Sequence, residues 1–326
     1  MQGFWKNLPK PFFALAPLAN VTDAAFRAVI AKYGKPHVMF TEFVSADGLF
    51  MGGMEKLMFD LLFGAKERPI VAQFFTARPE NMEKAAMLAR ELGFDGIDIN
   101  MGCPDRSIER QGAGAAHMKN PKLAREIIRA AKKGALDLPV SIKTRIGYNK
   151  DELESWLPEL LAAEPAAITL HARTRKEMSK VPAHWNRVKD AVKIRDSLKS
   201  KTLIVGNGDT FNIVDARMRA TESGADGIML GRAIFGNPWM FREYAPSLGE
   251  KLEVLVEHTE LFEQLLGSVK NFAIMKKHYK AYVNGWEGAK ELRVKLMGAA
   301  SAREVQMTVE KYLEDGNVHG RMKNEP

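Results

Sequence analysis

Short apolar runs alternate with longer amphipathic segments over the first three-quarters of the chain. Eight of these runs are rich in β-branched or aromatic residues and lack regular two-residue alternation, which is typical of strands buried on both faces of a parallel sheet. The predicted strands cover residues 12–17, 38–43, 69–74, 96–100, 140–144, 167–171, 203–206 and 227–231.

Helical periodicity separates most of the predicted strands, over residues 23–33, 79–92, 121–133, 151–163, 185–198 and 211–223. Two of these segments begin at recognisable start signals, Thr22 before the first and Asn120 followed by Pro121 before the third. Eight strands with helices between most of them, over about 235 residues, predict an α/β fold of the TIM (β/α)8 barrel type. A doubly wound sheet is the alternative, but the barrel accounts for all eight strands.

The alternation stops near Pro246, and residues 249 to 314 read as helices without strands. We therefore expect two domains, a TIM barrel over residues 1–246 and a small C-terminal helical domain over residues 247–326.

Composition is typical of a globular protein, with 46% hydrophobic and 27% charged residues among 326. The single cysteine, Cys103, excludes an internal disulfide and cysteine-only metal sites, and the histidines lack metal-ligand spacing, so no metal is expected. The first residues lack an apolar signal segment, and no run reaches the ~18 apolar residues of a membrane helix. These features predict a cytoplasmic protein without a membrane partner, and a monomer is the default expectation.

Polar side chains end four consecutive predicted strands, where residues of a TIM barrel build the active site. Buried polar groups need partners, so these side chains either satisfy one another or bind a polar ligand. Their clustering on one rim favours a ligand site. The residues concerned are Gln73, Asn100, Lys143, Arg145, His171 and Arg173.

Glycine-rich segments follow the last two predicted strands, 206–209 (Gly-Asn-Gly-Asp) and Gly231-Arg232. Loops at this position are the common phosphate site of the fold, because glycines let backbone amides approach a phosphate and arginine adds a charged fork. Lys143, deeper in the rim, would stabilise negative charge on a reduced flavin ring. A phosphate site together with this lysine favours FMN over a sugar phosphate.

The lone cysteine lies in the loop Gly102-Cys103-Pro104 after the fourth predicted strand. A thiol there can donate a proton to a carbon as a general acid, or attack as a nucleophile. No residue nearby in the sequence stands out as a base, which favours the general acid.

In these segments the chain resembles the tRNA-dihydrouridine synthases over residues 12–242. Each motif is weak alone, but seven in order with barrel spacing are specific. They are 16–23 (APLANVTD) with Phe26-Arg27, 41–46 (TEFVSA), 98–104 (DINMGCP), 143–145 (KTR), 171–175 (HARTR), 206–209 (GNGD) and 231–232 (GR). The chain departs from the family pattern at Ala172 and over residues 176–182, where a different loop follows the sixth strand.

The resemblance implies that NADPH reduces FMN, and that a flipped-out uridine of tRNA then accepts hydride while Cys103 protonates the neighbouring ring carbon. It implies substrate contacts from Asn100, Arg145 and Arg173, with Asn100 equally placed for the flavin. The cofactor-binding residues that it implies are Pro17, Ala19, Gln73, Lys143, His171, Asn207, Gly208, Asp209, Gly231 and Arg232.

Positive charge is concentrated over residues 267–303 of the expected helical domain, where eight basic residues stand against Glu287 and Glu291, and the whole chain carries +8 with a pI of about 9.4. Such a cluster fits a polyanionic partner, here tRNA, with Lys276 and Lys277 as candidate contacts. Tyr279, Tyr282 and Trp286 lie between the basic residues, as base-stacking groups or, the preferred interpretation, as core. The basic residues over 267–303 are Lys270, Lys276, Lys277, Lys280, Lys290, Arg293, Lys295 and Arg303.

Two other functions fit part of this pattern. A dihydroorotate dehydrogenase-like enzyme would use an FMN barrel on a free pyrimidine, but would not need a basic helical domain. An RNA-binding protein on a degenerate barrel would not need Lys143, Cys103 and two phosphate loops together.

Overall fold

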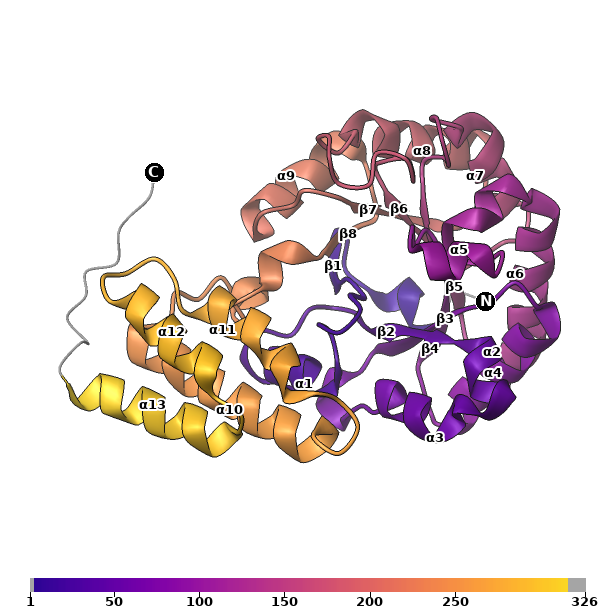
Figure 1. Cartoon of the computed structure of the whole chain (residues 1–326). Helices are drawn as coiled ribbons and strands as arrows, with labels where there is room; N and C mark the ends of the chain where they lie inside the picture. Colours follow the sequence, from indigo (N-terminus) through magenta and orange to yellow (C-terminus); the bar gives the residue numbers. More distant parts are fainter. Residues whose placement is uncertain (1–2, 316–326) are drawn as a thin grey trace.

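The protein is seen in a computed structural model that describes residues 3–315. Eight parallel strands pair in the order β1-β8-β7-β6-β5-β4-β3-β2. A bridge between Ala14 and Val38 joins β1 to the chain entering β2 and closes the ring (Figure 1). The predicted TIM barrel is thereby confirmed. Its strands are β1 Phe12–Leu15, β2 Met39–Ser45, β3 Ile70–Phe75, β4 Gly96–Met101, β5 Val140–Arg145, β6 Ala167–His171, β7 Leu203–Asn207 and β8 Gly227–Leu230.

Helices cover the outside of the barrel, and the six predicted ones are present to within two residues at each end. The Asn120 side chain accepts a hydrogen bond from the Leu123 N–H, as the predicted cap of its helix. Thr22 is not the cap of the first helix, because Asp23 accepts from the Phe26 N–H and Thr22 instead accepts from the Leu18 N–H. These helices are α1 Ala24–Tyr33, α4 Pro79–Glu91, α6 Pro121–Ala135, α7 Leu153–Leu161, α8 Trp185–Ser197 and α9 Ile213–Ser223.

Short helical turns that periodicity does not predict follow β2 and β4 and form part of the rim. Their few residues are too short for a 3.6-residue pattern to show. They are α2 Ala46–Gly48, α3 Met54–Leu57, α5 Arg106–Arg110 and the 3-10 helix η5 Gly114–Lys119.

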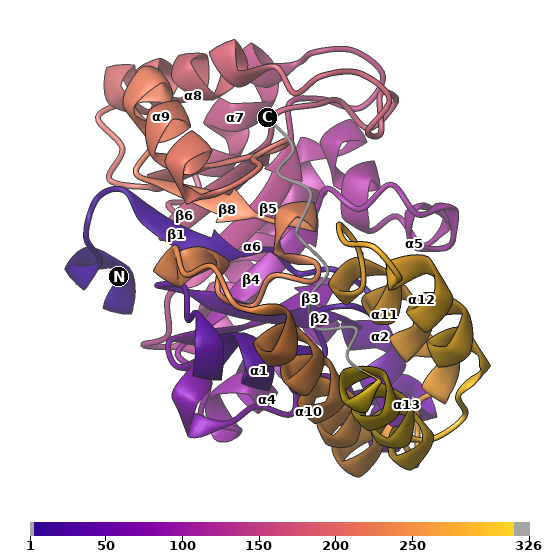
Figure 2. The same ribbon diagram turned by 90° about the vertical axis from the view of Figure 1, so that its left-hand side faces the viewer.

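The chain after the barrel folds into a layer of helices beside α1 (Figures 1 and 2). These are α10 Leu248–Leu266, α11 Lys276–Tyr282, α12 Ala289–Gly298 and α13 Ala302–Glu314. A second hydrophobic core lies within the layer and includes Ala25 and Val29 of α1. The helical region is confirmed, whereas a domain boundary at residue 246 stays a prediction, because the two parts share this core.

The aromatic side chains of the basic segment are buried in that second core. Tyr279, Tyr282 and Trp286 are at most 6% exposed, and the Trp286 indole N–H donates to the Tyr312 hydroxyl at 3.0 Å. Their interpretation as core residues is confirmed, so none of the three offers a face to an RNA base.

Candidate active site

A cavity of about 720 Å³ opens at the carboxyl ends of the barrel strands. This is the size and location expected of a ligand site in a TIM barrel. Twelve of the residues predicted from sequence line it: Pro17, Asn100, Cys103, Lys143, Arg145, His171, Arg173, Asn207, Gly208, Asp209, Gly231 and Arg232. Ala19, Gln73, Lys276 and Lys277 are not among the lining residues.

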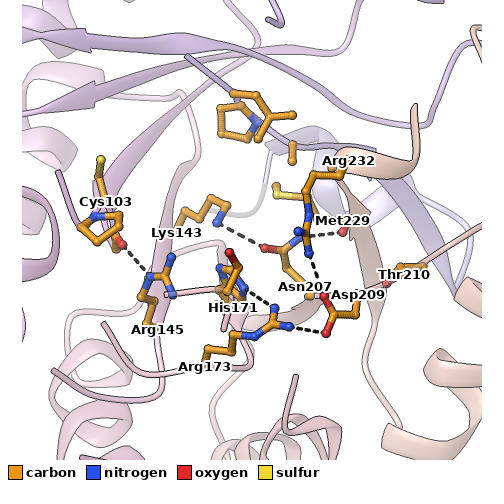
Figure 3. Close-up of a pocket in the computed structure, with 18 of the residues that line it drawn as sticks. Cys103, Lys143, Arg145, His171, Arg173, Asn207, Asp209, Thr210, Met229 and Arg232 are labelled. Atoms are coloured by element: carbon orange, nitrogen blue, oxygen red, sulfur yellow. Dashed lines mark hydrogen bonds and ion pairs between the residues drawn. The ribbon is translucent and has the colours of Figure 1, made fainter. Parts of the chain in front are cut away.

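The glycine-rich loop after β7 forms one end of the cavity. Asn207 is held by a 2.8 Å bond from its Nδ2 to the Met229 carbonyl, and its Oδ1 accepts from Lys143 Nζ at 3.4 Å (Figure 3). Gly208 has φ +129°, and a Cβ there would lie 2.9 Å from the Ala183 Cβ. Only glycine fits this position, which leaves the loop backbone open to the cavity.

Asp209 binds two arginines at the same end. Its carboxylate accepts from Arg232 Nη2 at 2.9 Å, from the Ala183 N–H at 2.9 Å, and from the Arg173 guanidinium. Burial raises the pKa of Asp209, but the bonds from Ala183 and Arg173 outweigh burial and hold that pKa below its usual value. An ionised carboxylate repels a phosphate, so this geometry suits Asp209 to orienting Arg173 and Arg232 rather than to touching an anion.

His171 and Lys143 lie side by side at the centre of the cavity wall. Burial, with the positive charge of Lys143 and Arg145, holds the pKa of His171 well below its usual value, so the ring is neutral. Its Nε2 therefore accepts from Arg173 Nη1 at 3.3 Å. Burial and the neighbouring Arg145 lower the pKa of Lys143 to about 8, so at neutral pH the lysine remains mostly a cation.

Thr210, next along from Asp209, is a lining residue that the sequence analysis missed. Its side chain is 7% exposed, and its Oγ1 has no hydrogen-bond partner among residues 3–315. A buried hydroxyl without a partner is costly, and because Thr210 lines the cavity its hydroxyl is free to bond to a ligand there. Its place directly after the Gly-Asn-Gly-Asp motif is the signal that would have identified it.

The cysteine loop forms the opposite end of the cavity (Figure 3). Asn100 Oδ1 accepts from the N–H groups of Gly102 and Cys103, at 3.1 and 2.9 Å. The Cys103 carbonyl accepts from the Ala115 N–H at 2.9 Å, which Gly114 permits because a Cβ there would lie 2.8 Å from the same carbonyl. The backbone N–H and the carbonyl of Cys103 are thus both hydrogen-bonded.

Arg145 connects this loop to the one that follows β6. Its Nε donates to the Gly102 carbonyl at 2.8 Å, and its Nη1 to the carbonyls of Thr174 and Met178 at 3.2 Å. Met178 belongs to the atypical loop 176–182, and it lines the cavity without having been predicted to do so. The loop that departs from the family pattern therefore forms part of the cavity wall.

The Cys103 thiol is half-buried and is held in its protonated form. Burial raises its pKa, although the Asp105 backbone N–H and then the cations of Arg145 and Lys143 partly oppose the shift. A protonated thiol suits a proton donor better than a nucleophile, which must be a thiolate. Within residues 3–315, no cluster of three or more candidate metal ligands exists, and no helix combines the length and apolarity needed to cross a membrane.

Structural comparison places the chain among (β/α)8 barrels. Morphinone reductase matches with a TM-score of 0.51 and 13% identity, over 74% of this chain and 86% of that one. Histamine dehydrogenase from Rhizobium sp. 4-9 matches with a TM-score of 0.51 and 12% identity, over 76% of this chain and 48% of that one. At such identities these likenesses support the fold alone.

Sequence comparison is far more specific. The probable tRNA-dihydrouridine synthase 2 of Bacillus subtilis (strain 168) is 39% identical over 95% of this chain and 97% of its own length. The probable tRNA-dihydrouridine synthase of Staphylococcus aureus (strain COL) is 37% identical over 95% and 96%. The model of the dihydrouridine synthase (Dus) family matches residues 14–316. The chain therefore belongs to the dihydrouridine synthase family.

Proposed function

We propose that the cavity binds FMN and that the protein reduces a uridine of tRNA at the expense of NADPH, with Cys103 as the proton donor. As a member of the dihydrouridine synthase family, the chain is a flavin-dependent oxidoreductase that forms dihydrouridine in tRNA. The observation that carries the detailed proposal is one cavity with a glycine-and-arginine cradle at one end, a protonated thiol at the other, and a lysine between them.

The residues present fit an FMN molecule. Gly208, Gly231, Arg232 and the partnerless Thr210 hydroxyl form a cradle with the donors that a phosphate needs. His171 and Asn207 would follow along the chain of the cofactor, and Lys143 would lie at the ring. When bound, the flavin supplies the hydride that it has received from NADPH.

Pro17 lines the cavity and suits the flavin ring, whereas the proposed ring contact of Ala19 needs a movement of its exposed loop. Gln73 is fully buried, and Asn100, which does line the cavity, bonds to it through Nδ2. A role for Gln73 toward the cofactor would therefore be exerted mainly by orienting Asn100.

Cys103 would give its thiol proton to one ring carbon of uracil as hydride reaches the neighbouring carbon. The C–C double bond becomes a single bond, and the resulting thiolate regains a proton from solvent. Asn100, Arg145 and Arg173 would hold the base, which must leave its stack to enter the cavity. For Arg145, Nε and Nη1 are occupied by backbone carbonyls, so Nη2 is the donor that a base would meet.

The test is the dihydrouridine content of unmodified tRNA, measured by nucleoside mass spectrometry after incubation with the purified protein, FMN and NADPH. New dihydrouridine is expected, and digestion of the tRNA then locates the site. If none forms while the protein is yellow and oxidises NADPH, the tRNA substrate is wrong. Free pyrimidines, as for a dihydroorotate dehydrogenase-like enzyme, are then the next substrates.

The helical layer would supply the contact with tRNA, but not through every lysine of the segment. Lys277 donates to the Asn20 carbonyl of the β1–α1 loop, and Lys270 is bound to Glu42 and Asp60 at 2.6 and 2.7 Å. Both hold the layer against the barrel, so Lys277 is a weaker candidate for RNA than the sequence suggests. The exposed cations Lys280, Lys290, Lys295 and Arg303, with the half-buried Lys276, remain available for phosphates.

Charge reversal at Lys276 and Lys280 is expected to weaken tRNA binding and leave flavin content unchanged. Each lost phosphate contact lowers the slope of log K against log salt by about 0.7 to 0.9, so two contacts lower it by roughly 1.5. Filter binding over a salt series measures both values. The double reversal at Lys122 and Arg129, on the exposed side of α6, changes the net charge equally and serves as control. Equal affinities in the two variants would refute the helical-layer footprint.

Location and assembly follow the same proposal. A tRNA substrate and a catalytic thiol that must stay reduced fit the cytoplasm. We infer a monomer as the default state, and size-exclusion chromatography with light scattering tests this.

A further inference from the structure

A fully buried carboxylate lies on β4 below the cavity. Asp98 is two residues before Asn100, so both side chains face the same side of the strand. In the register of the sheet, Asp98 lies directly between Gln73 of β3 and Ser141 of β5. It accepts from Gln73 Nε2 at 2.6 Å and from Ser141 Oγ at 2.6 Å.

A chain of hydrogen bonds leads from Asp98 to the cysteine loop. Asn100 Nδ2 donates to Gln73 Oε1 at 3.1 Å, and Asn100 Oδ1 accepts from the N–H groups of Gly102 and Cys103. An ionised carboxylate can only accept, so Gln73 must turn Nε2 toward it and Oε1 toward Asn100. Asn100 is then forced to turn Oδ1 toward the loop. The Asp98 carboxylate thereby sets the orientation of the Gln73 and Asn100 amides, and so directs Asn100 Oδ1 toward the Cys103 N–H.

The charge on Asp98 is maintained despite its burial. Burial raises the pKa of Asp98 to about 6, against the hydrogen bonds from Ser141 and Gln73 and the positive charge of Lys143. At neutral pH the group is therefore mostly ionised and acts as the acceptor that the chain of bonds requires. A buried ionised carboxylate is costly, and a position serving packing alone would be filled by an apolar residue.

We propose that Asp98 is a positioning residue that fixes the place of the Cys103 thiol through Gln73 and Asn100. The role of the thiol as proton donor rests on the proposed function, whereas its fixed position does not. A reacting atom displaced by about 1 Å can cost about 100-fold in rate. The rate of dihydrouridine formation should therefore depend on Asp98, although Asp98 is not among the residues that line the cavity.

The experiment uses the full-length protein and its single cysteine. Because Cys103 is the only thiol, the rate of alkylation by iodoacetamide reports on this site alone. Asp98→Ala frees Gln73 and Asn100, so the loop loosens and the thiol becomes more exposed. Alkylation should accelerate about threefold for each unit by which the thiol pKa falls. Dihydrouridine formation should fall about 10- to 100-fold.

Two variants separate positioning from general loss of packing. Asp98→Asn keeps an oxygen for Gln73 and an amide for the Ser141 hydroxyl, so it should restore both the slow alkylation and most of the activity. Ser141→Ala removes the other partner of Asp98 but leaves the chain to Cys103 intact while Asp98 is ionised, so at pH 8 both readouts should stay within about twofold of the parent. If Asp98→Ala does not fold, Gln73→Leu breaks the same chain one link later and should also accelerate alkylation.

Positioning and function fail in different ways. An alkylation rate equal to that of the parent in folded Asp98→Ala or Gln73→Leu would overturn the positioning role, whatever happens to activity. Faster alkylation with undiminished dihydrouridine formation would leave Asp98 as the support of the loop but would overturn its effect on the rate, whereas the role of Cys103 as proton donor is tested separately by Cys103→Ala.

Discussion

Cys103→Ala should bind FMN and accept electrons from NADPH as the parent does, yet form dihydrouridine about 100- to 10,000-fold more slowly, the range attributed to a general acid. The thiol lies at the far end of the cavity from the glycine-and-arginine cradle (Figure 3). Its loss therefore leaves the proposed cofactor contacts in place. Alanine keeps the backbone bonds of residue 103 to Asn100 and Ala115, so the loop stays folded.

Three measurements on the same sample check this expectation: the visible flavin spectrum, the rate of its bleaching by NADPH without oxygen, and dihydrouridine by mass spectrometry. Ser107→Ala is the matched control, because Ser107 is exposed on the same segment and the Asp105 cap still accepts from its backbone N–H. Dihydrouridine formation at the parent rate in Cys103→Ala would show that another group, or water, supplies the proton.

The pH dependence gives an independent check on the parent enzyme. A general acid works only while protonated, and burial raises the pKa of the Cys103 thiol above its usual value. The proton-transfer step should therefore persist through neutral pH and decline only in the alkaline range. A decline already between pH 6 and 7 would point to a different donor.

The strands and the cavity could be predicted from sequence, because the hydrophobic pattern locates the strands and the barrel fold then places the cavity at their carboxyl ends. A (β/α)8 barrel brings the last residue of every strand to one rim, so Asn100, Lys143 and His171 could be grouped from sequence alone. The glycines after β7 and β8 predicted the phosphate end of the cavity because they too follow strand ends at this rim. At Gly208 the structure explains the glycine, since a side chain there would collide with Ala183.

The direction of individual side chains was not predictable in the same way. The Gln73 side chain bonds to Asp98 below the cavity, and the Lys277 side chain donates to the Asn20 carbonyl of the barrel. Both placements depend on neighbours far away in the sequence, Asp98 and Asn20, that no local pattern identifies. Thr210 was missed because its hydroxyl becomes conspicuous only when its burial is known.

Replacing His258 with phenylalanine and His278 with leucine is expected to stabilise the protein, and to do so more strongly in acid. Both rings are fully buried between α10, α11 and Phe26, 4.7 Å apart, and none of their four nitrogens has a hydrogen-bond partner within residues 3–315. A buried polar group without a partner costs about 1 to 3 kcal/mol. Apolar rings or side chains of similar size should recover part of that cost at neutral pH.

The acid dependence follows from the protonation of each state. Burial lowers the pKa of His258 to about 3, and burial with the positive charges of His258 and Lys277 holds the pKa of His278 well below its usual value of 6.5. Between the low pKa values of the folded protein and the usual value of 6.5, the two histidines bind protons in the unfolded chain but not in the folded protein. The stability contributed by the neutral rings is complete above pH 6.5 and is lost as the pH falls, by about 1.4 kcal/mol per unit for each histidine.

Other buried groups titrate in the same range but do not affect the comparison. Burial raises the pKa of Asp23 and of Asp98 to about 6, so the folded state takes up protons there and gains stability as the pH falls. His117 and His171 act in the opposite direction, because burial lowers the pKa of each. All four are present in parent and variant alike, so their contributions cancel in the difference between the two.

Urea unfolding at pH 7 and pH 5 measures that difference. The gain from the double substitution should grow by about 4 kcal/mol between the two pH values. In the parent, each of the two histidines lowers the free energy of unfolding by about 1.4 kcal/mol per pH unit over the roughly 1.5 units between pH 6.5 and pH 5, and the variant lacks both. Each single variant should show about half. Phe26→Leu, in contact with both rings, should lower stability by the same amount at both pH values. A gain that does not change with pH would mean that water or a local opening lets both rings titrate as they do in the unfolded chain, and that the junction of barrel and helical layer is not a dry core.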